Sequence, residues 1–112
     1  MTDREYLELA AKAAGIELRW YLDGTAYSDS RCKDYWGVWN PLTDDGDALR
    51  LAVKLFMFVD SAAGAPDSFG AELVRAGNEV VDKTEPRTHN DPYAATRRAI
   101  VRAAAEIGRN MK

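Results

Sequence analysis

The stretch GVWNPLTDDGDALRLAVKL, residues 37–55, joins an Asn-Pro turn and a cluster of carboxylates to an apolar helix. The residue before a proline is pushed out of the helical region, so Asn40-Pro41 ends the preceding segment and the helix begins near Thr43 or Asp44. Helical spacing then aligns four apolar residues along the centre of one face, namely Leu49, Ala52, Val53 and Phe56.

This helix is apolar around most of its circumference. Three more residues, Ala48, Leu51 and Leu55, widen the apolar face. The remaining polar side is narrow and carries Asp47, Arg50 and Lys54. A helix with so little polar surface is expected to be mostly buried, so the stretch predicts a largely enclosed helix.

Two other segments have the start and stop signals of helices. Thr2 opens a capping box and Gly15 can take the left-handed conformation that ends a helix, which predicts a first helix between them. Asp91 is a strong N-cap and Pro92 suits the first helical position, which predicts a third helix to about Asn110. The apolar face of that third helix is expected to contain Tyr93, Thr96, Ile100, Ala103, Ala104, Ile107 and Met111.

The segment after the first helix has the pattern of strands. Apolar residues alternate over 16–22, and Asp23-Gly24 favours a two-residue hairpin turn into a returning strand at 25–27. Residues 28–34 have the composition of a polar loop, and residues 35–39 are predicted to form a further short strand.

A second hairpin is predicted around Gly77-Asn78, between a Gly/Ala/Pro-rich loop at 61–70 and a linker at 87–90. The order helix, hairpin, helix, hairpin, helix favours an α+β fold, because helices that cover a mostly antiparallel sheet would bury the apolar faces. The length of 112 residues predicts a single domain, 1–112.

Composition narrows the possible functions. Hydrophobic residues make up 46% and charged residues 29%, which is typical of a globular domain, and the net charge of -3 disfavours a DNA-coating protein. Cys32 is the only cysteine, which fits a reducing cytoplasm. No apolar run approaches a membrane span and the start lacks a signal-peptide pattern, so a cytoplasmic protein is expected.

Three segments together resemble a bacteriophage family: ELAAKAAGIEL (8–18), WNPLTDDGDALRLAVKL (39–55) and ATRRAIVRAAAEIG (95–108). The family is the phage ABA sandwich domain, a group of small proteins encoded by tailed phages and prophages. The similarity extends over nearly the whole chain and is weakest over 56–90. It implies an α-β-α sandwich and a phage origin, and it implies no activity and no catalytic residues.

The carboxylates Asp44, Asp45 and Asp47 could in principle hold a divalent cation through oxygen ligands. The spacing does not match a calcium loop, because Leu55 occupies position 12 when Asp44 is counted as position 1. Carboxylates also gather at helix starts to cap free N–H groups and to complement the helix dipole. The second interpretation accounts for all three residues and is favoured.

Trp36, Trp39 and Asn40 form a second candidate site at the turn before the helix. A tryptophan there either packs under the helix or offers an aromatic platform to a ligand or partner. Packing is favoured for Trp39, which directly precedes the helix. Both roles stay open for Trp36, which lies beside the polar loop.

The arginines of the third helix form a third candidate site. Arg98, Arg102 and Arg109 share one face, which is either a phosphate- or acid-binding stripe or a solvated face partly paired through Glu106. Arg97 lies at the edge of the apolar face, where a carboxylate or a groove would hold its guanidinium; Arg50 on the second helix has a similar setting. The single His89 and the single Cys32 do not make a zinc site.

The sequence therefore favours a small non-catalytic phage accessory protein that acts by binding, for example on a host or defence protein in the infected cell. One alternative is sequestration of a nucleotide-like signal by Trp36 with Arg97 or Arg98. Another is a small metal-dependent enzyme that uses the Asp44–Asp47 cluster. No cofactor, membrane or nucleic-acid partner is expected. The chain is expected to form a homodimer or a higher homo-oligomer.

Overall fold

The computed structural model describes residues 1–32, 35–60, 73–86 and 91–111. In chain order the elements are α1 (Asp3–Ala14), β1 (Leu18–Trp20), β2 (Ala26–Cys32), β3 (Tyr35–Val38), α2 (Asp45–Lys54), β4 (Phe58–Asp60), β5 (Leu73–Gly77), β6 (Asp82–Pro86) and α3 (Pro92–Asn110). The prediction of a mixed α+β fold with three helices and antiparallel strands is confirmed for the described residues. The strands form two sheets, β1-β2-β3 and β4-β5-β6, which the sequence pattern did not distinguish from one sheet.

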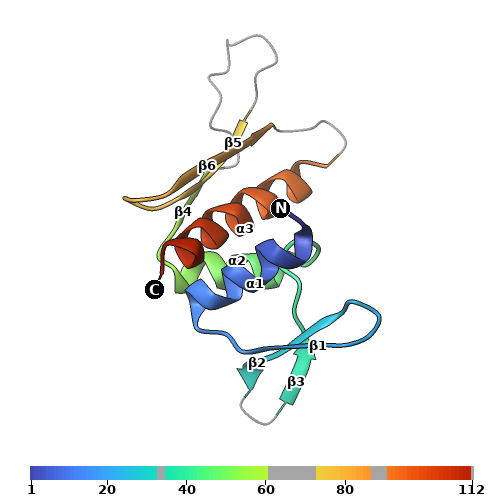
Figure 1. The fold of residues 1–112 in the computed structure, drawn as a ribbon. Coiled ribbons are helices and arrows are strands. Elements are labelled where there is room, and N and C mark those ends of the chain that lie inside the picture. The colour runs from blue at the N-terminus through green and yellow to red at the C-terminus, as the bar shows by residue number, and fades with distance from the viewer. Residues whose placement is uncertain (33–34, 61–72, 87–90, 112) are drawn as a thin grey trace.

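Helix α3 lies at the centre of the molecule. It contacts α1, α2, β5 and β6, and Figure 1 shows the helices between the two sheets, with β4–β6 against α3 and β1–β3 on the far side of α1 and α2. Four of its residues are completely buried: Ala99, Val101, Ala103 and Ala104. Its small side chains allow α1 to approach closely, and a Cβ added to Gly108 would lie 2.0 Å from the carbonyl oxygen of Leu9. None of the helices in the described ranges is long and apolar enough to cross a membrane.

The predicted caps of all three helices are present. Thr2 accepts a hydrogen bond from the backbone N–H of Glu5, and Gly15 ends α1 with a φ of 69°. Asp44 and Asp91 cap α2 and α3 in the same way as Thr2 caps α1. The beginnings of the helices are therefore fixed by local hydrogen bonds that the sequence encodes.

Sheet β1–β3 differs from its prediction in two details. The first turn is a three-residue loop and not a two-residue one, because the N–H of Tyr21 donates to the carbonyl of Thr25. Gly24 is the last residue of this loop and has a φ of 86°. The prediction of a polar loop from residue 28 is wrong for 28–32, since β2 continues to Cys32. Pairing with β3, which includes Ser28 opposite Gly37, keeps these polar residues in a strand.

The hairpin predicted around Gly77-Asn78 is confirmed as β5 and β6. The side-chain oxygen of Asn78 accepts hydrogen bonds from the N–H groups of Val80 and Val81, which closes the turn. Strand β4 pairs with β5 and lies at one edge of this sheet. The loop predicted at 61–70 and the linker predicted at 87–90 lie outside the described residues.

The prediction that α2 is mostly buried is wrong. Its buried residues are Asp47, Ala48, Leu51 and Ala52, whereas Leu49, Val53 and Phe56 are 62%, 66% and 91% exposed. Only one side of this ten-residue helix packs on the core, so of the four residues predicted at the centre of its apolar face only Ala52 is buried. The predicted apolar face of α3 is also partly wrong, because Tyr93 and Met111 are exposed.

Candidate functional site

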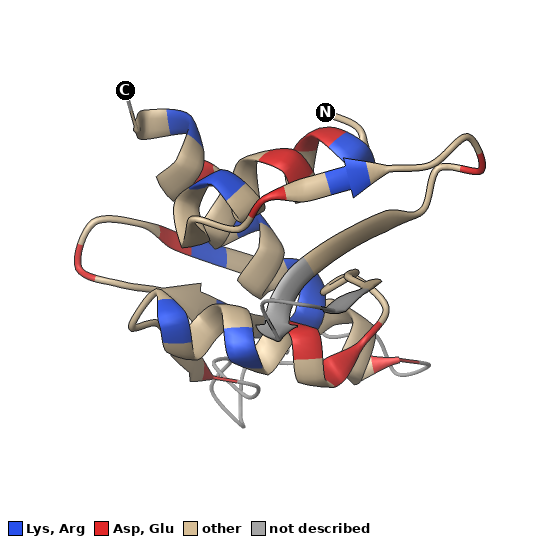
Figure 2. Ribbon diagram, turned by 90° about the horizontal axis from the view of Figure 1, so that it is seen from below, with Lys and Arg blue, Asp and Glu red and all other residues tan. Residues whose placement is uncertain are grey.

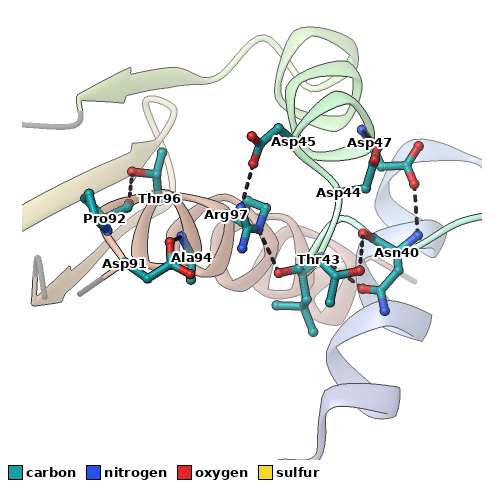
Figure 3. Close-up of polar contacts among 11 residues, drawn as sticks. Asn40, Thr43, Asp44, Asp45, Asp47, Asp91, Pro92, Ala94, Thr96 and Arg97 are labelled. Carbon is teal, nitrogen blue, oxygen red and sulfur yellow. Dashed lines mark hydrogen bonds and ion pairs between the residues drawn. The ribbon is translucent and has the colours of Figure 1, made fainter.

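The turn before α2 is held by hydrogen bonds around Asn40 (Figure 3). Its backbone N–H donates to Asp47 at 3.0 Å, and its side-chain oxygen accepts from the N–H of Leu42 at 3.0 Å. Its carbonyl accepts from the N–H of Thr43 and from the N–H of Asp44. Asn40 therefore shapes the chain at the start of the helix through both its backbone and its side chain.

The three carboxylates at the start of α2 each have a protein partner. Asp44 accepts from the backbone N–H of Asp47 at 2.7 Å, which is the N-cap contact. Asp45 accepts from Arg97 at 2.6 Å (Figure 3). The buried carboxylate of Asp47 accepts from Arg50 at 2.7 Å in addition to Asn40. No group of three or more potential metal ligands of the His, Cys, Asp or Glu type is assembled in the described residues.

Arg97 connects α3 to the start of α2. Its Nε donates to the carbonyl of Leu42 at 2.9 Å, and its terminal NH1 nitrogen lies 2.6 Å from the carboxylate of Asp45. The side chain is only 16% exposed, whereas that of Asp45 is 69% exposed. The predicted carboxylate partner is thus found, and the guanidinium joins two elements that are far apart in sequence.

Arg98 and Arg102 contact neighbouring elements and do not form one solvated stripe. Arg102 donates to Glu85 and to the carbonyl of Thr84, so its partner lies on β6 and not at Glu106. The hydrogen bond that Arg102 donates to Glu85 raises the pKa of Arg102 above its ordinary value. Arg98 lies 3.7 Å from Glu85 and 3.8 Å from Asp3. Over the described residues, Figure 2 shows basic and acidic segments interspersed, without a continuous basic face.

The structure shows the side chain of only one of the two candidate tryptophans. Trp39 is buried in the core at 3% exposure, which agrees with packing under α2. The backbone of Trp36 belongs to β3, but its side chain lies outside the described part of the structure, as does that of Cys32. His89 also lies outside it. The predicted grouping of Trp36 with Arg97 or Arg98 therefore lies outside the described residues.

An apolar groove lies between α2, α3 and β4. It has a volume of about 340 Å³ and is lined by Leu49, Val59, Tyr93, Ile100 and the Arg97–Asp45 pair, among others. Val59 is 40% exposed and Tyr93 is 68% exposed. We call the exposed apolar residues around this groove the apolar face, which consists of Leu49, Val59 and Tyr93.

Among the exposed apolar residues around the groove, Leu49 and Tyr93 were predicted to lie on buried helix faces, so the sequence missed the groove. A signal was nevertheless present, because α2 has more apolar residues than one buried side can accommodate. A groove of this kind suits apolar side chains of a ligand or another chain, since its polar groups at the rim already hydrogen-bond to each other.

A second depression, of about 370 Å³, lies on the other side of the first turns of α3. Its charged lining consists of Arg98 and three carboxylates, Asp3, Glu85 and Asp91. Its local charge is therefore negative, which disfavours phosphates and other anions next to Arg98.

Comparison of the chain with protein-family models, with curated proteins and with solved structures finds no match.

Proposed function

We propose that this chain is a small non-catalytic binding protein and that it contacts another polypeptide through its apolar face. The observation that carries the proposal is the exposure of Leu49, Val59 and Tyr93 around one apolar groove. Exposed large apolar side chains that gather beside a groove are typical of interaction surfaces, whereas single ones are normal on any protein.

The contacts of the arginines favour a polypeptide over a nucleotide-like ligand. Arg97 already donates to Leu42 and Asp45, and Arg50 is hydrogen-bonded to Asp47. A phosphate would have to replace these carboxylates, and beside Arg98 it would meet three more of them. Apolar side chains of a partner would instead enter the groove without breaking any of these hydrogen bonds.

A narrower role rests on the sequence resemblance alone. If the chain is a member of the phage ABA sandwich family, the polypeptide it binds in the infected cell is a host or defence protein, and binding serves takeover or counter-defence. The apolar face supports binding in general and does not by itself select this partner.

A photo-crosslinking amino acid in place of Tyr93 tests the proposal. In a host-cell lysate, this variant should become linked to a polypeptide, and Leu49→Asp should abolish the product because a charge in the groove disfavours apolar contact. The matched control carries the crosslinker in place of Tyr21, which is 56% exposed on the distant β1–β2 loop. Absence of a product from position 93, or equal products from both positions, would contradict the proposal.

A further inference from the structure

We propose that the polypeptide bound at the apolar face is an extended segment that adds a strand to the open edge of β4 and places a large apolar side chain in the groove. This inference rests on the proposed function, because it takes the apolar face to be a binding surface. It adds the conformation of the occupant, its hydrogen bonds to the backbone of β4 and the types of side chain it carries.

Strand β4 is the less protected edge of its sheet. In the described ranges its one strand partner is β5, and all of its side chains are exposed. The opposite edge, β6, packs on α3 and carries Lys83, Glu85 and Pro86, residue types that disfavour pairing with a further strand. β4 instead presents Phe58 and Val59, each 40% exposed. Of the two edges, β4 is therefore the one suited to accept another strand.

The backbone hydrogen bonds of β5 show which of its residues face β4. The N–H of Asn78 donates across the turn to the carbonyl of Val81, so Asn78 faces the β6 side. Along an antiparallel strand, residues that bond to one neighbouring strand alternate with residues that bond to the other. By this alternation, Gly77 and Arg75 bond to β4.

The register between β4 and β5 then places the backbone of Val59 at the open edge. Its neighbours Phe58 and Asp60 lie opposite the two β5 residues that face β4, and so they bond to β5. The N–H and the C=O of Val59 therefore point away from β5. In an antiparallel strand added beside β4, the residue opposite Val59 would make two hydrogen bonds with it.

This central residue of the added strand would also place its side chain in the groove. Side chains directly opposite each other on neighbouring strands project to the same face, with Cβ atoms about 4.5–5.5 Å apart. Val59 lines the groove together with Leu49 and Ile100, so a large apolar side chain opposite Val59 would enter it. Because β4 has only three residues, the backbone hydrogen bonds are few and this side chain supplies much of the affinity.

The other face of β4 indicates the neighbours of that central residue. Phe58 and Asp60 alternate with Val59, so they project to the opposite face of the sheet, and both are exposed. In an antiparallel strand, the residue before the central one lies opposite Asp60 and the residue after it lies opposite Phe58. Pairs of opposite charge and pairs of apolar groups across strands are stabilising. The occupant is thus an extended segment with the order basic, large apolar, apolar or aromatic.

A display library of random short peptides, panned on the full chain, supplies the probe. Peptides are kept when they bind the wild type and are lost on Leu49→Asp, which places a charge in the groove. We expect the kept peptides to share the basic, apolar, apolar order. N-methylation of the central apolar residue removes its N–H and should weaken binding about tenfold. N-methylation of the residue on either side should change affinity by less than about twofold, because those N–H groups point away from β4.

Exchange of Val59 for its α-hydroxy acid tests the protein side of the contact, because the ester keeps the side chain and removes only the N–H. Affinity for a kept peptide should fall about tenfold. The matched control is the same exchange at Val38, 53% exposed on the other sheet, which should leave affinity unchanged. In the unmodified protein, bound peptide should slow hydrogen exchange of the Val59 amide more than that of Phe58 or Asp60. Circular dichroism checks the folding of each variant.

Two results would overturn the inference. One is a set of peptides whose binding depends on Leu49 but not on the N–H of Val59 or of the central peptide residue, and this result would leave the proposed function standing. The other is a library that yields no peptide sensitive to Leu49→Asp. In that case the crosslinker at position 93 decides the proposed function separately, since it also detects a partner that is not an extended segment.

Discussion

Asp47 shows how a single side chain fixes the start of α2. Its carboxylate is buried, accepts the backbone N–H of Asn40 and binds the guanidinium of Arg50. A buried carboxylate is stable only when donors replace the water it has lost. The residue therefore joins the turn at Asn40 to the first turn of the helix, and it also holds Arg50 along the helix surface.

We expect Asp47→Ala to lower the free energy of unfolding by about 2 kcal/mol, because it leaves the N–H of Asn40 without its acceptor and Arg50 without its closest carboxylate. Urea unfolding followed by circular dichroism measures this loss. Asp3→Ala is the control, since Asp3 is 71% exposed and its ion pair spans 3.8 Å, so its effect should stay within about 0.5 kcal/mol. Equal losses in both variants would contradict the structural role of Asp47.

The sequence predicted correctly the residues whose hydrogen-bond partners lie close to them in the chain. Thr2, Asp44 and Asp91 are caps that bond three residues ahead, so their roles can be read from spacing. The partners of Arg97 could not be predicted, because Asp45 lies 52 residues away and only the packing of α2 on α3 brings them together. Asp47 was assigned to the polar side of α2, and its burial depends on a turn that periodicity does not describe.

At the scale of elements, the contact between α1 and α3 depends on small residues. Both helices present alanines to each other, and Gly108 lies against the backbone of Leu9. The two backbones are so close here that a Cβ does not fit at position 108, since it would lie 2.0 Å from the carbonyl oxygen of Leu9. The absence of a side chain at position 108 therefore sets how closely the two helices pack.

We expect Gly108→Ala to destabilise the protein by about 1–3 kcal/mol, because the added methyl group must push α1 away from α3. The higher helix propensity of alanine acts in the opposite direction and is smaller. Arg109→Ala, at the exposed neighbouring position, should change stability by less than about 0.5 kcal/mol. Thermal and urea unfolding of the two variants compare these effects, and a neutral Gly108→Ala would show that the helices are less closely packed than described.

The β5–β6 hairpin carries an ion pair whose effect on stability should depend on pH. Arg75 donates to both carboxylate oxygens of Asp82 at 2.8 Å, and this hydrogen bonding lowers the pKa of Asp82. A lowered pKa in the folded state stabilises the protein above the ordinary aspartate pKa of about 3.9, and this contribution is lost as pH falls through the lower value.

The difference in unfolding free energy between the wild type and Asp82→Asn should therefore be constant near neutral pH and shrink in acid. Urea unfolding at a series of pH values measures it. Glu79→Gln serves as the control, because Glu79 has no ion pair or hydrogen bond through its side chain in the described ranges and should show no such trend. A pH-independent difference for Asp82→Asn would mean that the ion pair does not form in solution.

Helices and strands were predicted correctly where the local sequence pattern agrees with the tertiary surroundings of the element. Helices α1 and α3 and the two hairpins follow from caps, alternation and turn residues. The extension of β2 to Cys32 was missed because polar residues stay in a strand when a neighbouring strand pairs with them. The exposed side of α2 was missed because periodicity shows how much of a helix is apolar, and only the tertiary arrangement shows which part the monomer covers.

At the scale of the whole molecule, α3 connects parts that hardly contact one another. It packs against both other helices and against β5 and β6. Among the described side chains, Trp39, which directly follows β3, and the partly buried Leu18 and Trp20 join sheet β1–β3 to the core. Most contacts of the sheet are between its own strands. The structure therefore has a strongly packed centre and a sheet at its edge that is held by fewer neighbours.

This arrangement predicts an order of local opening. In native-state hydrogen exchange, backbone amides of α3 around Val101 should exchange most slowly, because exposing them requires separation of α1, α2 and sheet β4–β6. Amides of β1 and of the paired part of β2 should exchange faster, through opening of the outer sheet alone. Gly108→Ala should reduce the difference in exchange rate between the α3 amides and the β1–β2 amides, because it loosens α1 from α3. Arg109→Ala should leave this difference unchanged. Equal protection in α3 and β1 would instead mean that the two sheets and three helices open as one unit, and that the connection through Trp39 is as strong as the packing around α3.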